Sequence, residues 1–164
     1  MSITIAKPTV LDLLLLCNQA RPDEIMQYEA LVGKEWVTEE VAVDFFVRDG
    51  TKFVLLEGDK PICAGGYDLI IPGVWHSWMV GTMENWDTHW RSITKYSRRV
   101  MDGLFEEGAR RLQTCVLAER KKACEWYVRG LKMQFEGSMR NFGSNGETMD
   151  MYARIREIGN GQFK

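Results

Sequence analysis

The sequence predicts an α+β domain built on a mixed, mainly antiparallel sheet of about seven strands flanked by helices. Segments typical of strands and helices follow one another in the order β, α, α, α, β, β, β, α, β, α, β, β. The length of 164 residues suits one domain, which we expect over residues 1 to 158, with a short tail from 159 to 164. Hydrophobic residues make up 45% and charged residues 27%, as in ordinary globular proteins.

One strand and a helix are expected at the N-terminus. Ser2 to Ala6 alternates polar and apolar residues, as strands do, and Pro8 closes this segment. The apolar run that follows predicts a helix from about Val10 to Gln19. That run contains Asp12 and is far shorter than the roughly 20 residues that cross a bilayer, so we expect a buried helix and no contact with a membrane.

Two more helices precede the central strands. Pro22, Asp23 and Glu24 are typical of a first helical turn, and Gly33 of a helix stop, which predicts a helix from about Pro22 to Leu31. Thr38 is expected to cap the third helix, because acidic residues and apolar residues at helical spacing follow it.

Three strands should form the middle of the sheet. Thr51 to Glu57 and Ile62 to Ile71 are separated by a Gly-Asp-Lys turn, which favours an antiparallel hairpin. Val74 to Thr82 follows Pro72-Gly73 and is predicted to be the central strand.

The C-terminal half alternates helices and strands. One face of the segment from Thr88 to Glu107 is apolar, which predicts a long amphipathic helix. Leu112 to Ala118 is expected to be a buried strand and Glu119 to Arg129 a helix. A final hairpin is predicted, with strands from Met133 to Arg140 and from Met149 to Arg156.

This order of elements resembles the GNAT superfamily of acyl-CoA-dependent N-acyltransferases. The strand from Leu112 to Ala118, the helix that ends at Trp126-Tyr127-Val128-Arg129-Gly130 and the run Phe135-Glu136-Gly137 look like the end of its fold. Within the superfamily, the chain looks most like small GNAT-like proteins of short-tailed phages that are related to an internal virion protein. Met26 to Gly33, Trp78 to Thr82 and the polar helix that follows carry this second resemblance.

The resemblance implies a cofactor site that this sequence only partly matches. In the superfamily the acyl-pantetheine arm lies beside the fourth strand, which assigns Trp78, Met79, Val80 and Gly81. A glycine-rich loop then holds the pyrophosphate with backbone N-H groups. Here the corresponding residues, 82 to 89, contain no glycine, and Glu84 and Asp87 would repel the pyrophosphate. The resemblance would place Thr88 to Arg91 near the pyrophosphate.

A row of basic residues follows that segment. Arg91, Lys95, Arg98 and Arg99 fall in the first half of the expected helix, with at least three on one face. Three explanations remain open: a solvated face paired locally with Asp87 or Asp102, a site for phosphate or coenzyme A, and contact with an acidic protein or nucleic acid.

Two residues are candidates for proton transfer. Tyr127 lies near the position of the superfamily's thiolate-protonating tyrosine, but it precedes Gly130 by three residues instead of four, which would rotate its side chain by about 100°. A core or interface tyrosine is the alternative. Glu57, at the end of a strand, is a candidate base or an ordinary surface carboxylate.

Metal and thiol chemistry find no support in the sequence. His76 and His89 are the only histidines, and without a carboxylate cluster they predict no metal site; a strand histidine such as His76 could face substrate or serve structure. The four cysteines form no C-x-x-C pair, which predicts reduced thiols in the core of a cytoplasmic protein. The N-terminus does not have the pattern of a signal peptide.

The charge and the tryptophans bear on partners. A net charge of −2 argues against nucleic acid as a general partner. Trp86, Trp90 and Arg91 could form a patch for a phage structural protein or for self-association, or the tryptophans could clamp the sheet edge.

The sequence thus leaves two hypotheses. One is a protein of virion assembly or interaction with a degenerate pyrophosphate loop and weak or absent catalysis, located in the host cytoplasm or with the virion. The alternative is an active acetyl-CoA-dependent N-acetyltransferase that acts on a small amine or a protein amine, with Tyr127 as its acid.

Overall fold

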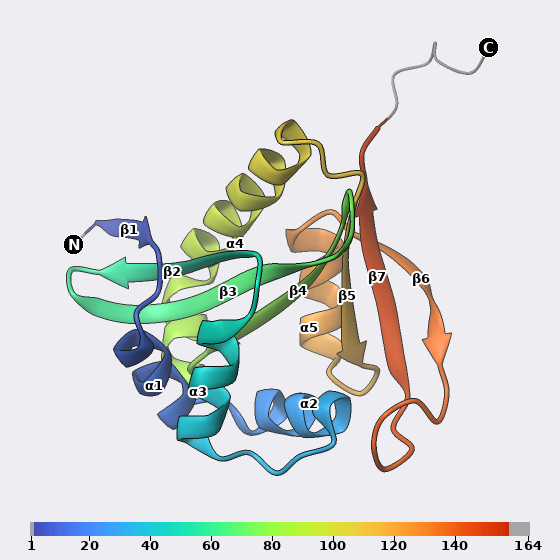
Figure 1. Ribbon diagram of the computed structural model, residues 1–164, viewed down its shortest axis with the longest axis horizontal. Helices are drawn as coiled ribbons and strands as arrows, with labels where there is room; N and C mark the ends of the chain where they lie inside the picture. The colour runs from blue at the N-terminus through green and yellow to red at the C-terminus, as the bar shows by residue number, and fades with distance from the viewer. Residues whose placement is uncertain (1, 158–164) are drawn as a thin grey trace.

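A seven-stranded sheet runs through the molecule (Figure 1). The computed structural model describes residues 2–157, so the tail expected at residues 159–164 lies outside the described residues. The strands are β1 (Ile3–Ala6), β2 (Thr51–Glu57), β3 (Lys60–Ile71), β4 (Val74–Gly81), β5 (Arg111–Leu117), β6 (Gln134–Met139) and β7 (Met149–Ile155). Their order in the sheet is β1-β2-β3-β4-β5-β7-β6, and only β4 and β5 pair in parallel. The predicted α+β class and the central position of β4 are confirmed.

Helices cover both faces of this sheet. They are α1 (Val10–Asn18), α2 (Pro22–Val32), α3 (Thr38–Val47), α4 (Met83–Glu106), α5 (Lys121–Glu125) and the π-helical turn η1 (Trp126–Gly130). α1 and α3 pack on one face, where Leu13 and Val41 contact Val54 of β2. α4 packs on the other, where Ile93 meets Phe53 and Leu55. Because neighbouring side chains of a strand point to opposite faces, β2 serves both cores.

Two helix starts differ from the prediction. α4 begins at Met83 instead of Thr88, because the Thr82 side chain accepts a hydrogen bond from the Asn85 amide and caps the helix directly after β4. The segment expected to be an irregular loop is therefore helical. Thr38 is the first residue of α3 and not its cap; Val37 occupies the cap position and makes no capping hydrogen bond with its side chain.

The helix predicted over residues 119–129 is split in two. α5 ends at Glu125, and η1 follows with a wider turn in which the Leu131 amide donates to the Trp126 carbonyl. Only glycine fits at position 130 without a shift of its neighbours, because a Cβ there would lie 2.7 Å from the Trp126 ring.

β4 and β5 form a fork. They pair only between Val74 to His76 and Arg111 to Gln113, and beyond this they diverge. The two strands continue for several residues on either side of the gap, β4 to Gly81 and β5 to Leu117. The fork therefore opens in the middle of the sheet, between the two halves of the fold.

The four cysteines lie in the core. All are free and buried. Burial raises the pKa of the Cys17 thiol to about 12 and that of Cys115 to about 11, because the charged thiolate loses its hydration. The structure agrees with the expectation that these residues fill space in the core.

Truncating a core residue of α4 should destabilise the fold. Ile93 is fully buried against the sheet, so we expect Ile93→Ala to lower the free energy of unfolding by about 2 to 5 kcal/mol through a cavity. Urea denaturation followed by circular dichroism measures this change. Leu11→Ala, at a residue that is 63% exposed on α1, is the control and should change it by less than about 0.5 kcal/mol. Equal losses in the two variants would show that α4 does not pack as described.

Candidate functional site

Two cavities meet at the fork between β4 and β5. One, of about 460 Å³, lies between the sheet, α2 and the end of α3. The other, of about 390 Å³, lies between the sheet, the start of α4 and α5. Ser77, Trp78 and Met79 border both. The gap between the strands therefore offers two chambers, one on each face of the sheet, with β4 between them.

Helix α2 bridges the open end of the fork with two polar side chains. On the β4 side, the Gly81 amide donates to Glu24 Oε2 at 3.1 Å. On the β5 side, the Leu117 amide donates to Gln27 Oε1 at 3.1 Å. Arg120 completes the bridge by donating to both Gln27 and Asp23. Backbone groups that the diverging strands could not satisfy between themselves are thus satisfied by α2.

Glu24 is a buried carboxylate at the centre of this bridge. The residue is 8% exposed, and Arg21 donates to its Oε1 at 2.9 Å. Burial raises the pKa of Glu24, although the charge of Arg21 and the Gly81 amide oppose the shift. A carboxylate held in this way binds a proton more readily than an exposed one.

The far end of α2 is tied to the last hairpin. Gly33 ends the helix in the left-handed conformation, with a φ of 73°. The Ser144 amide, in the loop between β6 and β7, donates to the Ala30 carbonyl at 2.8 Å, and its hydroxyl donates to the Glu29 carbonyl. Both ends of α2 are therefore fixed by elements distant in the sequence.

The start of α4 fills the position that the resemblance gives to the pyrophosphate. The Trp86 amide donates to the Thr82 carbonyl, and the amides of residues 87 to 89 lie within the helix. The Trp86 indole lies against Gly81, where a Cβ would be 2.8 Å from Nε1. Arg21 lies over this ring at 5.0 Å, and Trp126 meets its edge. In the described chain, Thr82 alone separates β4 from α4, so no loop comes between them.

The residues expected to bind cofactor fall into two groups. Trp78, Met79, Val80 and Gly81 lie on β4 beside the fork, as the resemblance implies. Thr88, Arg91 and Lys95 lie on the exposed side of α4, and neither cavity has them in its wall.

Most of the basic row on α4 has local partners. Arg91 lies over the Trp90 ring at 4.8 Å, and Arg99 over that of Tyr96 at 5.4 Å. Arg98 donates to the Gly130 and Arg129 carbonyls and so caps η1. The expected pairing with Asp102 does not form, since Arg154 bonds that carboxylate.

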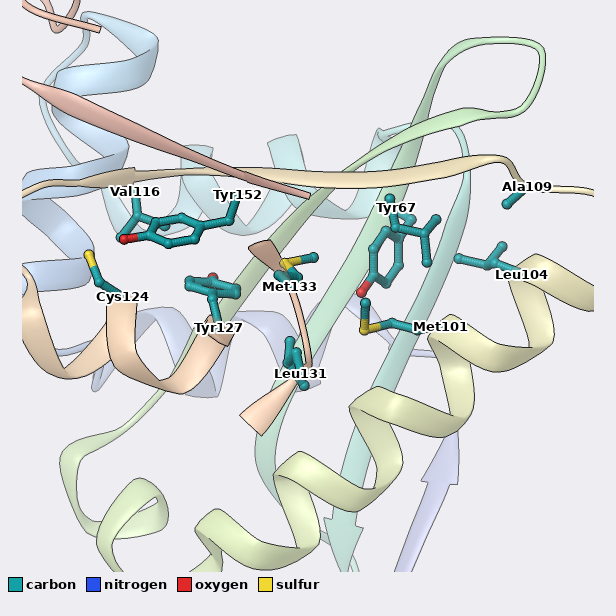
Figure 2. Close-up of a cluster of buried hydrophobic side chains, with 11 residues drawn as sticks. Tyr67, Met101, Leu104, Ala109, Val116, Cys124, Tyr127, Leu131, Met133 and Tyr152 are labelled. Carbon is teal, nitrogen blue, oxygen red and sulfur yellow. The ribbon is translucent and has the colours of Figure 1, made fainter. Parts of the chain in front are cut away.

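Tyr127 faces the fork despite its spacing from Gly130. It is 8% exposed, lines the smaller cavity and stacks on Tyr152 with 6.1 Å between ring centroids (Figure 2). The Thr114 side chain lines the same cavity. Burial raises the pKa of Tyr127, and the charge of Arg120 opposes this shift. Tyr127 is thus a core residue whose phenol keeps its proton at the wall of the smaller cavity.

Glu57 lies at the end of the sheet where β4 ends and α4 begins, but it is on β2, two strands away from the fork. It pairs with Ile3 in the register of β1 and β2, and its Oε2 is 3.6 Å from His89 Nε2 of α4. Neither of the two fork cavities has Glu57 in its wall. This contact joins β2 to the second turn of α4.

His76 stands where β4 and β5 separate. Its Nδ1 lies 3.3 Å from Gln113 Nε2, and Asp68 of β3 is its cross-strand partner. Burial lowers the pKa of His76, and the charge of Asp68 opposes this shift. His76 therefore presents a mostly neutral ring to the larger cavity, whose walls also carry the stacked rings of Phe45 and Trp78.

Sequence reasoning missed the residues of α2. Glu24, Gln27, Tyr28 and Leu31 recur at helical spacing and all line the larger cavity. This pattern was available in the sequence. An acidic residue is also common in the first turn of a helix, however, so Glu24 is interpreted from the sequence alone as a helix-start signal and not as a residue of the site.

Two general features of the described chain complete the site. Among residues 2–157, no three His, Cys, Asp or Glu side chains lie close enough to share a metal ion. Within the same residues, no helix is both long enough and apolar enough to cross a membrane.

Comparisons with known proteins give a fold but no sequence family. No family model matches the sequence, and a search of curated proteins finds no match. Among solved structures, the ribosomal-protein-S18-alanine N-acetyltransferase of Escherichia coli superposes with a TM-score of 0.72 at 14% identity, covering 99% of this chain and 100% of that one.

Two further structures agree. A mutant of the spermidine N-acetyltransferase of Vibrio cholerae gives a TM-score of 0.70 at 14% identity and covers 93% of each chain. A GNAT-family acetyltransferase of Bacillus anthracis gives 0.71 at 12% identity, with 94% of this chain and 95% of that one covered. The chain therefore has the fold of the GNAT acetyltransferases.

Replacing Glu24 with an uncharged isostere should change how stability depends on pH. Because the raised pKa means that the folded chain holds this proton more tightly, the Glu24 carboxylate destabilises the fold as pH rises. The free energy of unfolding of the unaltered chain, minus that of Glu24→Gln, should fall from about pH 4.3, the usual pKa of glutamate, through the raised pKa. Urea titrations between pH 4 and 8 measure it.

Glu106→Gln, at an exposed residue of α4, is the control for a loss of charge. A difference for Glu24→Gln that rises with pH instead would contradict the description of Glu24 as a buried carboxylate penalised by burial.

Proposed function

We propose that this protein acts by binding other proteins, as an assembly or interaction protein of a phage particle, and that its acyl-CoA catalysis is weak or absent. One observation carries this: α4 starts directly after β4, so the amides of residues 86 to 89 belong to the helix and the Trp86 indole lies beside Gly81. The residues present do not fit the pyrophosphate of coenzyme A.

Charge at the same place supports the proposal. Glu84 and Asp87 lie in the first two turns of α4 and are exposed, so they would repel a pyrophosphate approaching the start of the helix. On the opposite side, the Gly81 amide already donates to Glu24. A fold alone does not determine an activity, and this site lacks the glycine-rich pyrophosphate loop that the resemblance leads us to expect.

The phage context of this proposal is inferred from the resemblance of the sequence. Met26 to Gly33 and Trp78 to Thr82 resemble segments of small GNAT-like proteins of short-tailed phages. We infer the host cytoplasm or the virion as the location. Trp90, which is 48% exposed beneath Arg91, is available for self-association, whereas Trp86 is turned inward against Trp126.

A specific observation favours an N-acetyltransferase as the second candidate. The fork has a cavity on each face, and both reach Ser77, Trp78 and Met79. Tyr127 holds a proton at one wall, and His76 offers a nitrogen at the other. From these positions Tyr127 could donate a proton to the leaving thiolate, and His76 could accept a proton from the attacking amine.

Titration calorimetry with acetyl-CoA and desulfo-CoA separates the two candidates. We expect no binding, or a dissociation constant in the millimolar range, which is about −4 kcal/mol. The reason is that the chain has no glycine-rich loop after β4, and the Asn85 and Trp86 amides are already bonded to Thr82.

The controls for this titration use the basic residues of α4. Micromolar binding that is lost in the double variant Arg91→Ala, Lys95→Ala and kept in Arg99→Ala would overturn the proposal and support the transferase. Arg99 lies on the same helix and is exposed, so it matches the other two in charge and setting.

The interaction role predicts an assembly in solution or a partner in the infected cell. Multi-angle light scattering should show a multimer, or the chain should retain a capsid, portal or tail protein from a lysate of the infected host. A monomer that retains none of these would contradict the role.

A further inference from the structure

The outward faces of α1 and α3 form one apolar surface, which we call the α1/α3 face. Its members are Leu11 and Leu15 of α1 and Val43, Phe46 and Val47 of α3, which are between 40 and 64% exposed. A folded domain leaves single apolar side chains exposed at many places, but five on two adjacent helices form a patch.

The spacing of these residues makes the patch continuous. Leu11 and Leu15 are four residues apart, as are Val43 and Val47, so each pair lies along one side of its helix. That side is opposite the one that packs on the sheet, where Leu13, Leu16 and Val41 are buried. α1 and α3 pack against each other (Figure 1), so the two apolar rows run over neighbouring helices.

The two helices themselves carry charges of one sign, and the Lys52 ammonium lies 5.9 Å from the centre of the Phe46 ring. Every charged side chain within α1 and α3 is acidic: Asp12, Glu39, Glu40 and Asp44. The cations closest to α3 along the chain are already engaged. Arg48 is bonded to Asp44, and Lys52 donates to the Phe46 and Arg48 carbonyls. Lys7 and Lys34 lie in the connections that precede α1 and α3, outside either helix.

We propose that the α1/α3 face binds a basic amphipathic helix of a partner protein. The apolar side of such a helix would cover Leu15, Val43 and Val47, and its lysine or arginine side chains would meet Glu39 and Glu40. α1 and α3 have nine and ten residues. They are about 14 Å long at 1.5 Å per residue, so a helix of about three turns spans them.

Charge argues against a second copy of this chain as the occupant. Two α1/α3 faces brought together would set Glu39, Glu40 and Asp12 of one chain against the same carboxylates of the other. Like charges that close disfavour association. This inference names the surface for the interaction role proposed above and rests on that role.

The test uses two synthetic peptides and the full chain. Both are fluorescein-labelled 18-residue helices with leucine at positions i, i+3, i+4 and i+7; the remaining positions are lysine in one and glutamate in the other. Fluorescence anisotropy should show saturable, micromolar binding of the lysine peptide that weakens as salt is added, and no binding of the glutamate peptide.

Variants locate the binding on the chain. Val43→Ser with Val47→Ser should weaken binding of the lysine peptide at least tenfold. The matched control, Leu69→Ser with Ile71→Ser, alters two residues of β3 that are 50 and 55% exposed and should leave binding unchanged. Glu39→Lys with Glu40→Lys changes only exposed charges and should shift preference from the lysine peptide to the glutamate peptide.

Several outcomes would overturn the inference. They are equal binding of the two peptides, binding that the Val43→Ser, Val47→Ser variant retains, absence of binding, and a dimer in light scattering that this variant abolishes. The last would make the face a contact between copies. The coenzyme titration reports separately on the proposed function, so its result does not depend on this face.

Discussion

The hydrogen bonds of α2 across the fork hold the site together. β4 and β5 separate after His76 and Gln113, which exposes strand backbone that has no partner strand. Glu24 accepts from Gly81 on one side and Gln27 from Leu117 on the other. Since buried backbone groups need partners, α2 stabilises the open end of the fork by supplying them to these two amides. The shape of both cavities follows from where α2 is held.

This bridge also occupies a backbone group at the end of the fork, and our proposal of weak or absent catalysis draws on that. The resemblance places pantetheine beside β4, but in this chain the Gly81 amide already donates a hydrogen bond to Glu24. The Trp86 indole closes the same end, and Arg21 joins the two by bonding Glu24 and lying over Trp86. What remains open is the middle of the fork, bordered by Ser77 to Met79, with Tyr127 and His76 on its two sides. The fork therefore keeps an open cavity at its middle, while Glu24, Arg21 and Trp86 occupy its end.

The superposed acetyltransferases share the architecture at 14% identity or less, and this limits what they say about chemistry. A sheet of this order needs apolar strands, two layers of helices and a bridge at the fork, and many side chains satisfy these needs. Activity needs particular groups at particular atoms. The outward faces of α1 and α3 contribute neither to the buried core nor to the walls of the fork cavities, which is why we propose a binding role for their apolar and acidic surface.

Local signals in the chain were enough to predict the order of elements, because hydrophobic periodicity, Gly33 and the Pro22 turn act over a few residues. They also located β4 and the absence of a glycine loop. Three features emerged from the packed molecule alone: α4 starts at Met83, η1 places Tyr127 at the wall of the smaller cavity, and Glu24 reaches Gly81. Glu24 and Gly81 are 57 residues apart in the sequence, and packing brings them together. A contact of that range leaves no mark in a local pattern, since its energy comes from burial shared by several elements.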